Sequence, residues 1–164
     1  RFGFINIIKG ELKIDYLNKI GPDVLEISTK QSRVIIDKSK KSKSLIKDFI
    51  LNQKYMSGIG NIYANEILFA SRIHPETKVN TLSSNNWKDI FNNTKKIMQL
   101  AIKNNGTTLS DMTYFLPYGE FGSNQKYLKI YSKTNCSNCE HIIDKIYINQ
   151  RATYICMKCQ KLKN

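Results

Sequence analysis

Residues 136–159 read CSNCEHIIDKIYINQRATYICMKC and hold every cysteine of the chain. They form two Cys-x-x-Cys pairs, Cys136–Cys139 and Cys156–Cys159, separated by sixteen residues. Each pair can direct two thiolates at one point, and two pairs complete a tetrahedral shell for one structural Zn²⁺. The segment between the pairs is long enough for a two-stranded hairpin that brings them together. The sequence therefore predicts a four-cysteine zinc finger built on a small β-hairpin.

Two other uses of cysteine compete with zinc in this segment. A redox Cys-x-x-Cys uses one pair beside a βαβ pattern, whereas this chain has two pairs around a hairpin. A disulfide between two of the cysteines is the second alternative, but thiols confined to metal-type spacing suit a reducing compartment. A closed four-cysteine site folds and presents the hairpin and performs no chemistry itself.

The charge balance of the chain points to a polyanionic partner. Its 164 residues carry 26 Lys and Arg against 13 Asp and Glu, which gives a net charge of +13 at pH 7. Nucleic acid is the simplest such partner, although a lysine-rich composition alone can produce the same excess. No apolar run of about 18 residues is present, so no membrane partner is expected.

The residues before the cysteines carry mainly helical patterns. Helices are expected from Ser44, as N-cap, to before Ser57-Gly58, then from Asn61 to His74-Pro75, and over residues 83–103 with Ser83 as N-cap. In the last helix the apolar positions recur on one face, namely Trp87, Ile90, Phe91, Ile97, Met98 and Ala101.

The remaining segments are read as loops and short strands. Residues 2–8 and 127–132 have strand character, and residues 11–30 read as loop with short helix around the turn Gly21-Pro22. The lysine cluster KSKKSKS at residues 38–44 is either a solvated linker or part of a basic surface.

Residues 53–66, QKYMSGIGNIYANE, place Gly58 and Gly60 between two expected helices. A helix N-terminus with free N–H groups binds phosphate, and glycine lets a ligand approach the backbone closely. Lys47 and Lys54 lie just upstream and add positive charge. The segment is no dinucleotide fingerprint, because no strand precedes it and the third glycine is missing. In a basic chain with a zinc hairpin, it predicts a clamp for a DNA phosphate.

Several motifs together resemble one enzyme family. GIGNIYANEILFASRIHP at residues 58–75 resembles the helix–two-turn–helix signature of the bacterial formamidopyrimidine-DNA glycosylase and endonuclease VIII family. GTTL at residues 106–109, QRATYICMKCQ at residues 150–160 and the opening residues 1–3 resemble the same family, in the same order. The resemblance implies a helix–two-turn–helix DNA-binding domain followed by the zinc finger.

The resemblance also implies an activity. Members of this family excise oxidised bases from DNA and nick the strand at the abasic site, after flipping the damaged nucleotide out of the stack. The amine of an N-terminal proline attacks C1′, with the neighbouring glutamate as acid/base partner, and the resulting iminium permits elimination. The expected partner is double-stranded DNA with a damaged base or abasic site, bound by a monomer in a bacterial-type cytoplasm at the nucleoid.

By position in these motifs, four residues match the DNA-backbone contacts of the helical domain. Asn61 matches the asparagine that holds the phosphates around the flipped nucleotide. Lys47, together with Lys43 and Lys54, matches basic positions that face the DNA backbone.

Four further residues match positions around the lesion. Arg151 matches the hairpin arginine that binds the flanking phosphates and assists elimination, and its alternative role is that of a solvated turn residue. Phe2 matches the aromatic wedge that replaces the flipped base, or is a strand core residue. Thr107 and Thr108 open the loop that covers the extruded base in the formamidopyrimidine branch.

The chain departs from the family pattern at two points. It has no N-terminal Pro-Glu, and the stretch that often reads Gly-Tyr-Phe in the family is Gly122-Ser123-Asn124 here. We therefore expect residues 1–30 to be the remnant of a first domain and a linker, residues 31–125 the helical domain, and residues 126–164 the zinc finger. Such a chain alone is not expected to excise bases. The alternatives are a non-enzymatic zinc-containing nucleic-acid-binding module and a zinc-stapled interaction domain.

Overall fold

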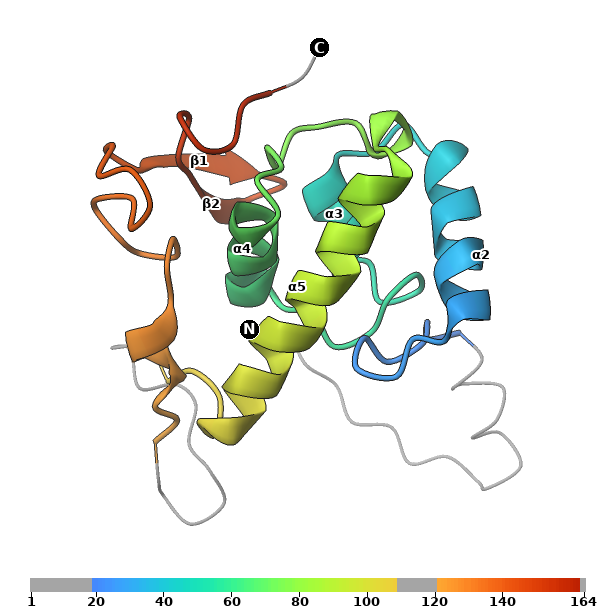
Figure 1. Cartoon of the computed structure of the whole chain (residues 1–164), viewed down its shortest axis with the longest axis horizontal. Helices are drawn as coiled ribbons and strands as arrows, with labels where there is room; N and C mark the ends of the chain where they lie inside the picture. The colour runs from blue at the N-terminus through green and yellow to red at the C-terminus, as the bar shows by residue number, and fades with distance from the viewer. Residues whose placement is uncertain (1–18, 109–120, 163–164) are drawn as a thin grey trace.

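The computed structural model describes residues 19–108 and 121–162. Its elements are the helices α2 (Thr29–Lys40), α3 (Ile46–Leu51), α4 (Asn61–Ala70) and α5 (Ser84–Lys103), the short 3-10 helices η1 (Val79–Thr81) and η2 (Asn124–Tyr127), and the strands β1 (Asp144–Ile148) and β2 (Arg151–Ile155). Helix α5 crosses the middle of the molecule, with α2 on one side and the hairpin at the opposite end (Figure 1). The predicted class, mainly α with a small β-hairpin, is confirmed. Within the described ranges no helix is both long and apolar enough to cross a membrane.

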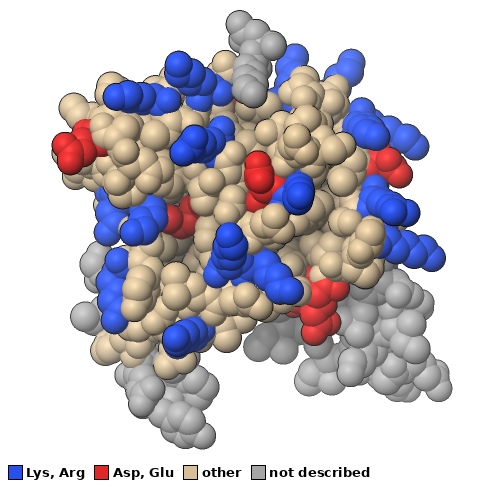
Figure 2. All heavy atoms as spheres, viewed as in Figure 1, with Lys and Arg blue, Asp and Glu red and all other residues tan. Residues whose placement is uncertain are grey.

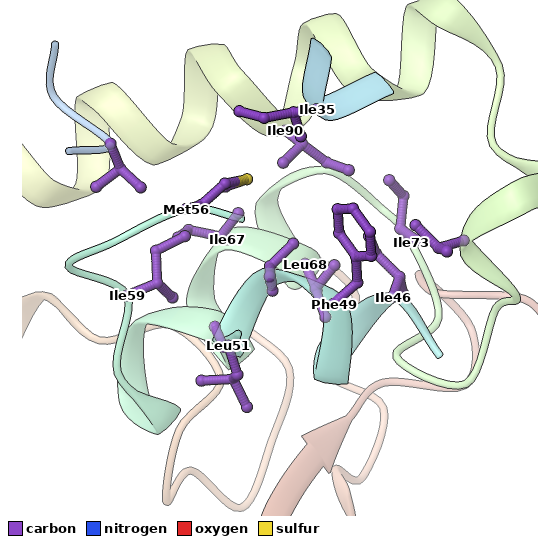
Figure 3. Packing of buried hydrophobic residues seen from close by; sticks show 14 of the residues in the cluster. Ile35, Ile46, Phe49, Leu51, Met56, Ile59, Ile67, Leu68, Ile73 and Ile90 are labelled. Carbon is purple, nitrogen blue, oxygen red and sulfur yellow. The ribbon is translucent and has the colours of Figure 1, made fainter. Parts of the chain in front are cut away.

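The main core lies where α3, α4 and α5 meet. Phe49 of α3 packs edge-on against Trp87 of α5, with ring centroids 5.8 Å apart, and both rings are buried. Figure 3 shows aliphatic side chains from these helices around Phe49, and the fully buried ones include Ile46, Ile67 and Ile90. The apolar periodicity of these helices therefore produces one shared core.

Helix α5 follows its sequence prediction closely. Ser83 is the N-cap, and its hydroxyl and the Asn86 amide form a reciprocal capping box. Gly106 follows the helix with φ of +79°, and its N–H donates to the Ala101 carbonyl at 2.8 Å. This left-handed ending favours glycine. The predicted stripe along α5 is buried at Trp87, Ile90 and Ala101 and half-buried at Phe91, Ile97 and Met98.

Helix α2 was not predicted, although the sequence carries its signal. Ser28 is the N-cap and forms a capping box with Gln31, so Ser-x-x-Gln marks the start of the helix. Lys38 and Lys40 lie in its last turn, where positive charge is favourable beside the exposed carbonyl groups. The lysine cluster is thus in part a helix end and not only a linker.

Helix α3 begins differently from the expectation. Its N-cap is Leu45, which makes no side-chain capping bond, so the predicted cap at Ser44 is wrong. The Ile46 N–H donates to the Thr77 carbonyl at 2.8 Å, and the Lys47 N–H donates to the Pro75 carbonyl at 3.3 Å. A turn distant in the sequence therefore caps this helix. Helix α4 itself ends at Ala70, four residues before the predicted stop at His74.

The strand predicted over residues 127–132 is replaced by η2 and a series of bends and turns. The cause is Glu66, a residue of α4 that is only 4% exposed. Its carboxylate accepts three consecutive backbone N–H groups, from Lys129 at 2.8 Å, Ile130 at 3.0 Å and Tyr131 at 2.9 Å. An alternating strand cannot direct three successive N–H groups to one point, so the prediction here was wrong.

Replacing Glu66 should therefore loosen the attachment of the zinc finger. We expect Glu66→Ala to lower the free energy of unfolding by about 3 kcal/mol or more, because each of the orphaned N–H groups costs roughly 1–3 kcal/mol. Urea unfolding followed by circular dichroism measures this, with the exposed Glu26→Ala as the matched control. Equal midpoints for the two variants would contradict the role given to Glu66.

Candidate metal centre and nucleic-acid interface

Strands β1 and β2 form an antiparallel hairpin in the register Ile148↔Arg151, Tyr147↔Ala152 and Lys145↔Tyr154. The two-residue turn between them is Asn149-Gln150, and both residues have positive φ, 46° and 62°. This is the geometry of a type I′ turn, whose twist matches that of paired strands. The hairpin therefore presents Arg151 directly after a rigid turn.

The four cysteines meet at the base of the hairpin, as the sequence predicts. Their sulfur atoms all lie within 4.8 Å of one another. The distances are 3.7 Å for Cys136–Cys159, 3.5 Å for Cys139–Cys156 and 3.5 Å for Cys139–Cys159. A disulfide needs about 2.05 Å between sulfurs, and all four thiols are free.

This geometry fits zinc. Four thiolates at about 2.3 Å from a tetrahedral Zn²⁺ lie about 3.8 Å from one another, close to the observed separations. A backbone hydrogen bond from His141 lowers the pKa of Cys139 to about 7, while burial raises the pKa of Cys159 to about 12. A divalent cation stabilises all four as thiolates. The four cysteines therefore form the binding site of one structural zinc ion.

Zinc removal should unfold the hairpin. The purified protein should contain about one zinc per chain, and a strong chelator should abolish the near-ultraviolet circular dichroism of the tyrosines on the finger. The same loss is expected for Cys156→Ser without chelator, because a hydroxyl is a poor zinc ligand. A folded hairpin without metal, or a disulfide in the native protein, would refute the prediction.

The outer edge of β2 docks onto α4 through two asparagines. Asn61 Nδ2 donates to the Ala152 carbonyl at 3.0 Å, and Asn65 Oδ1 accepts the Tyr154 N–H at 2.8 Å. In this register the polar groups of Ala152 and Tyr154 point away from β1. Residues i and i+4 of a helix rise about 6 Å, and residues i and i+2 of a strand about 6.6 Å. The two spacings match, so the helix supplies the partner that the edge strand lacks.

Lys47 reaches the same carbonyl from α3. Its side chain is 0% exposed, and Nζ donates to the Ala152 carbonyl at 3.1 Å and to the Thr153 hydroxyl. Burial, and then the charge of Arg151, lower the pKa of Lys47 to about 8, against a smaller opposing effect of Asp48. Lys47 thus lies beneath the hairpin and raises the positive potential there. Its predicted contact with the DNA backbone stays a prediction.

Arg151 is exposed at the start of β2. It lines a pocket of about 250 Å³ with Asp48, Leu51, Asn52 and Asn149. The Asn149 amide donates to the Asp48 carboxylate at 2.8 Å, which fixes the hairpin turn against α3. The structure therefore brings Lys47 and Asn61 together at the Ala152 carbonyl and places Arg151, the residue before Ala152, beside α3.

The other predicted basic contacts lie on the surface. Lys43 and Lys54 are both exposed. Positive side chains are spread widely over the face seen in Figure 2 and outnumber the acidic ones. Lys43 and Lys54 thus stay predicted DNA contacts.

The two threonines of the GTTL motif both make hydrogen-bond contacts. Thr107 and the Tyr63 hydroxyl lie 3.0 Å apart, and buried Thr108 accepts the Gly122 N–H at 2.9 Å. A Cβ at Gly122 would lie 2.4 Å from the Gly106 carbonyl oxygen, so glycine is required there. The Thr108–Gly122 bond therefore joins the described chain on either side of residues 109–120. Phe2 lies outside the described residues.

The two glycines in the turn before α4, Gly58 and Gly60, have different roles. Gly58 has φ of +103°, a conformation that favours glycine. Gly60 is the N-cap of α4 without a side-chain capping bond, and a Cβ on it would meet nothing within 4 Å. Packing within the described chain therefore does not require glycine at position 60. Gly60 leaves open space beside the first N–H groups of α4.

Three residues that position the zinc finger were not predicted: Asn65, Glu66 and Gln160. Buried Gln160 donates to the Ile73 carbonyl at 2.9 Å and accepts the Cys156 N–H at 3.2 Å, so it joins a zinc ligand to the helical domain. For Asn65 and Glu66 the sequence does carry a signal: they are adjacent polar residues within a mainly apolar stretch of helix. Buried polar groups need hydrogen-bond partners, so this pair predicts a polar contact.

Comparison with known proteins agrees with this geometry. The family model for the formamidopyrimidine-DNA glycosylase H2TH domain matches residues 20–113, and that for the zinc finger found in FPG and IleRS matches residues 136–162. The chain belongs to the formamidopyrimidine-DNA glycosylase family. This membership confirms the resemblance inferred from the motifs.

Individual relatives cover almost all of the chain. The formamidopyrimidine-DNA glycosylase of Mycoplasma genitalium is 40% identical over 99% of this chain and 57% of the relative, and that of Listeria monocytogenes is 38% identical over 98% and 59%. The Lactococcus lactis Fpg, solved with DNA containing an abasic site, superimposes with a TM-score of 0.82 at 31% identity, covering 94% of this chain and 57% of that one. The chain thus spans somewhat more than half the length of these members of the formamidopyrimidine-DNA glycosylase family.

Proposed function

We propose that residues 1–164 are the DNA-binding C-terminal part of a base-excision repair enzyme, a bifunctional DNA glycosylase and abasic-site lyase that acts on oxidised bases. The observation that carries the proposal is the meeting of Lys47 and Asn61 at the Ala152 carbonyl, with the charge of the adjacent Arg151 close enough to lower the pKa of Lys47. Family membership and the Lactococcus lactis Fpg solved with abasic-site DNA support it. The partner is double-stranded DNA with a damaged base or abasic site, bound by a monomer at the bacterial nucleoid.

The groups near the Ala152 carbonyl have the chemistry of a phosphate-binding site. Asn61 stands at the uncapped N-terminus of α4, where the helix dipole favours an anion, and Gly60 leaves room for it. The Arg151 guanidinium can bind phosphate oxygens in pairs, which lysine cannot do. In the proposed lyase step, Arg151 binds the phosphate next to the abasic site and stabilises the negative charge of the leaving group.

Binding to DNA should be strongly dependent on salt. A clamp that neutralises about four phosphates gives a slope near −3 to −4 in a plot of log affinity against log salt concentration.

Asn61→Ala should weaken binding to an abasic-site duplex by roughly 1.5–3 kcal/mol, because a hydrogen bond to a charged group is lost. Fluorescence anisotropy over a salt series measures both quantities.

Asn85→Ala is the matched control, because Asn85 is an exposed asparagine in the first turn of another helix, α5. It should bind as the unsubstituted chain does. A slope near zero would mean that the +13 charge reflects composition alone. Equal affinity for intact and abasic-site duplex would favour the alternative function, a non-enzymatic nucleic-acid-binding module.

Base excision by residues 1–164 alone is not expected. Such chemistry needs an accessible amine that is uncharged near neutral pH. Burial lowers the pKa of Lys47 to about 8, but this amine is fully buried and bound to the hairpin. Borohydride treatment with a duplex containing an oxidised base should therefore trap no covalent adduct. An adduct that disappears in Lys47→Met would contradict this expectation.

A further inference from the structure

The exposed face of the hairpin carries a lysine held between two tyrosine rings. Lys145 Nζ lies 5.5 Å from the ring centroid of Tyr147 and 5.9 Å from that of Tyr154. Both distances are within the range of cation–π attraction. Tyr154 is held in turn by an edge-on contact with Tyr131, at 4.9 Å between centroids. We call Lys145, Tyr147 and Tyr154 the tyrosine–lysine face.

The hairpin register explains why these three side chains share one face. Tyr147 stands opposite Ala152, and Lys145 stands opposite Tyr154. Residues two apart on a strand, and residues opposite one another, point to the same side of the sheet. The other side, with Ile148, Thr153 and Ile155, is buried against the domain.

The tyrosine–lysine face is positively charged and lacks an acidic partner. In the described part of the chain, no Asp or Glu lies within ion-pair distance of Lys145. Its pKa is raised, first by a hydrogen bond with the Tyr147 side chain, so the ammonium remains charged. Tyr147 is 66% exposed. The ring of Tyr147 thus lies in water beside the Lys145 ammonium, which the rings of Tyr147 and Tyr154 orient.

Strand β2 lies between Tyr147 of this face and Asn61 of the proposed phosphate clamp. Ala152, opposite Tyr147, is the residue whose carbonyl accepts from Asn61 and Lys47. By the alternation of side chains along β2, Arg151 shares the side of Thr153 and Ile155, whereas Ala152 shares the side of Tyr147. Lys145 of β1 and Asn61 of α4 therefore flank the same strand, β2.

We propose that the tyrosine–lysine face is an additional binding surface for the phosphodiester backbone of duplex DNA, beyond the phosphates held by Asn61 and Arg151. The Lys145 ammonium contacts one phosphate, the Tyr147 ring orients it, and the Tyr147 hydroxyl donates a second hydrogen bond. This inference rests on the proposed function and extends its footprint. The local charge favours DNA over an apolar protein partner.

The test compares Lys145→Gln and Tyr147→Phe with the unsubstituted 164-residue chain on an abasic-site duplex, by anisotropy between about 50 and 200 mM salt. Lys145→Gln should reduce the magnitude of the log–log slope by about 1 and weaken binding about three- to fivefold. Tyr147→Phe keeps the ring and loses the hydroxyl, so affinity should fall with a smaller change in slope. The effect of Lys145→Gln should disappear when the duplex is shortened past the contacted phosphate.

The control for charge is Lys30→Gln, an exposed lysine on α2, at the opposite end of the molecule from the hairpin (Figure 1). Zinc content and circular dichroism confirm that each variant is folded. If Lys145→Gln changes the slope no more than Lys30→Gln, while Asn61→Ala still weakens binding, the inference is wrong and the proposed function stands. Absence of DNA binding by the unsubstituted chain would overturn both.

Discussion

The buried carboxylate of Glu66 joins the two halves of this molecule. A charged group in the interior is tolerated only when its oxygens are fully hydrogen-bonded, and here three consecutive backbone N–H groups from residues 129–131 do this. The chain that enters the zinc finger is therefore fixed to α4 by directional bonds. Asn65 and Gln160 add two more such bonds, to Tyr154 and Ile73. Apolar contact alone allows sliding, whereas these bonds fix both the distance and the orientation of the finger.

Zinc and these polar bonds have separate tasks. The metal closes the finger, whose own buried apolar residues are few, namely Ile130, Cys136, Ile143 and Cys156, which pack against Phe69 of α4. A core of this size does not stabilise a hairpin of five-residue strands by itself. The bonds from α4 then set where the folded finger points. Arg151 reaches its place at the hairpin turn beside α3 only when both tasks are fulfilled, so residues far from the proposed phosphate site control its geometry.

The sequence predicted the features that depend on local spacing. Two Cys-x-x-Cys pairs, the Ser83 cap and the glycine after α5 each act within a few residues, and each was found where expected. The start of α2 carries the same kind of local signal, the Ser28-x-x-Gln31 capping box, but this helix was not predicted. The wrong predictions depend on distant partners. Ser44 does not cap α3, because a turn at residues 75–77 does so, and residues 127–132 form no strand, because Glu66 lies more than sixty residues away in the chain. The local spacing of apolar and polar residues along the sequence carries no information about such distant partners.

The carbonyl of Ala152 links the fold to the proposed binding of DNA. It accepts from both Lys47 and Asn61, while Asn61 Oδ1 is buried with no partner. Two donors that share one neutral oxygen form weaker bonds than each would form with a charged phosphate oxygen. A phosphate placed at the open N-terminus of α4 therefore competes well for the Asn61 amide, and Lys47 keeps the Ala152 carbonyl satisfied when Asn61 turns away. Asn61 can thus exchange its hydrogen bond to the hairpin for a stronger one without leaving the Ala152 carbonyl unpaired, which is why we assign the supporting role to Lys47 and the contacting role to Asn61.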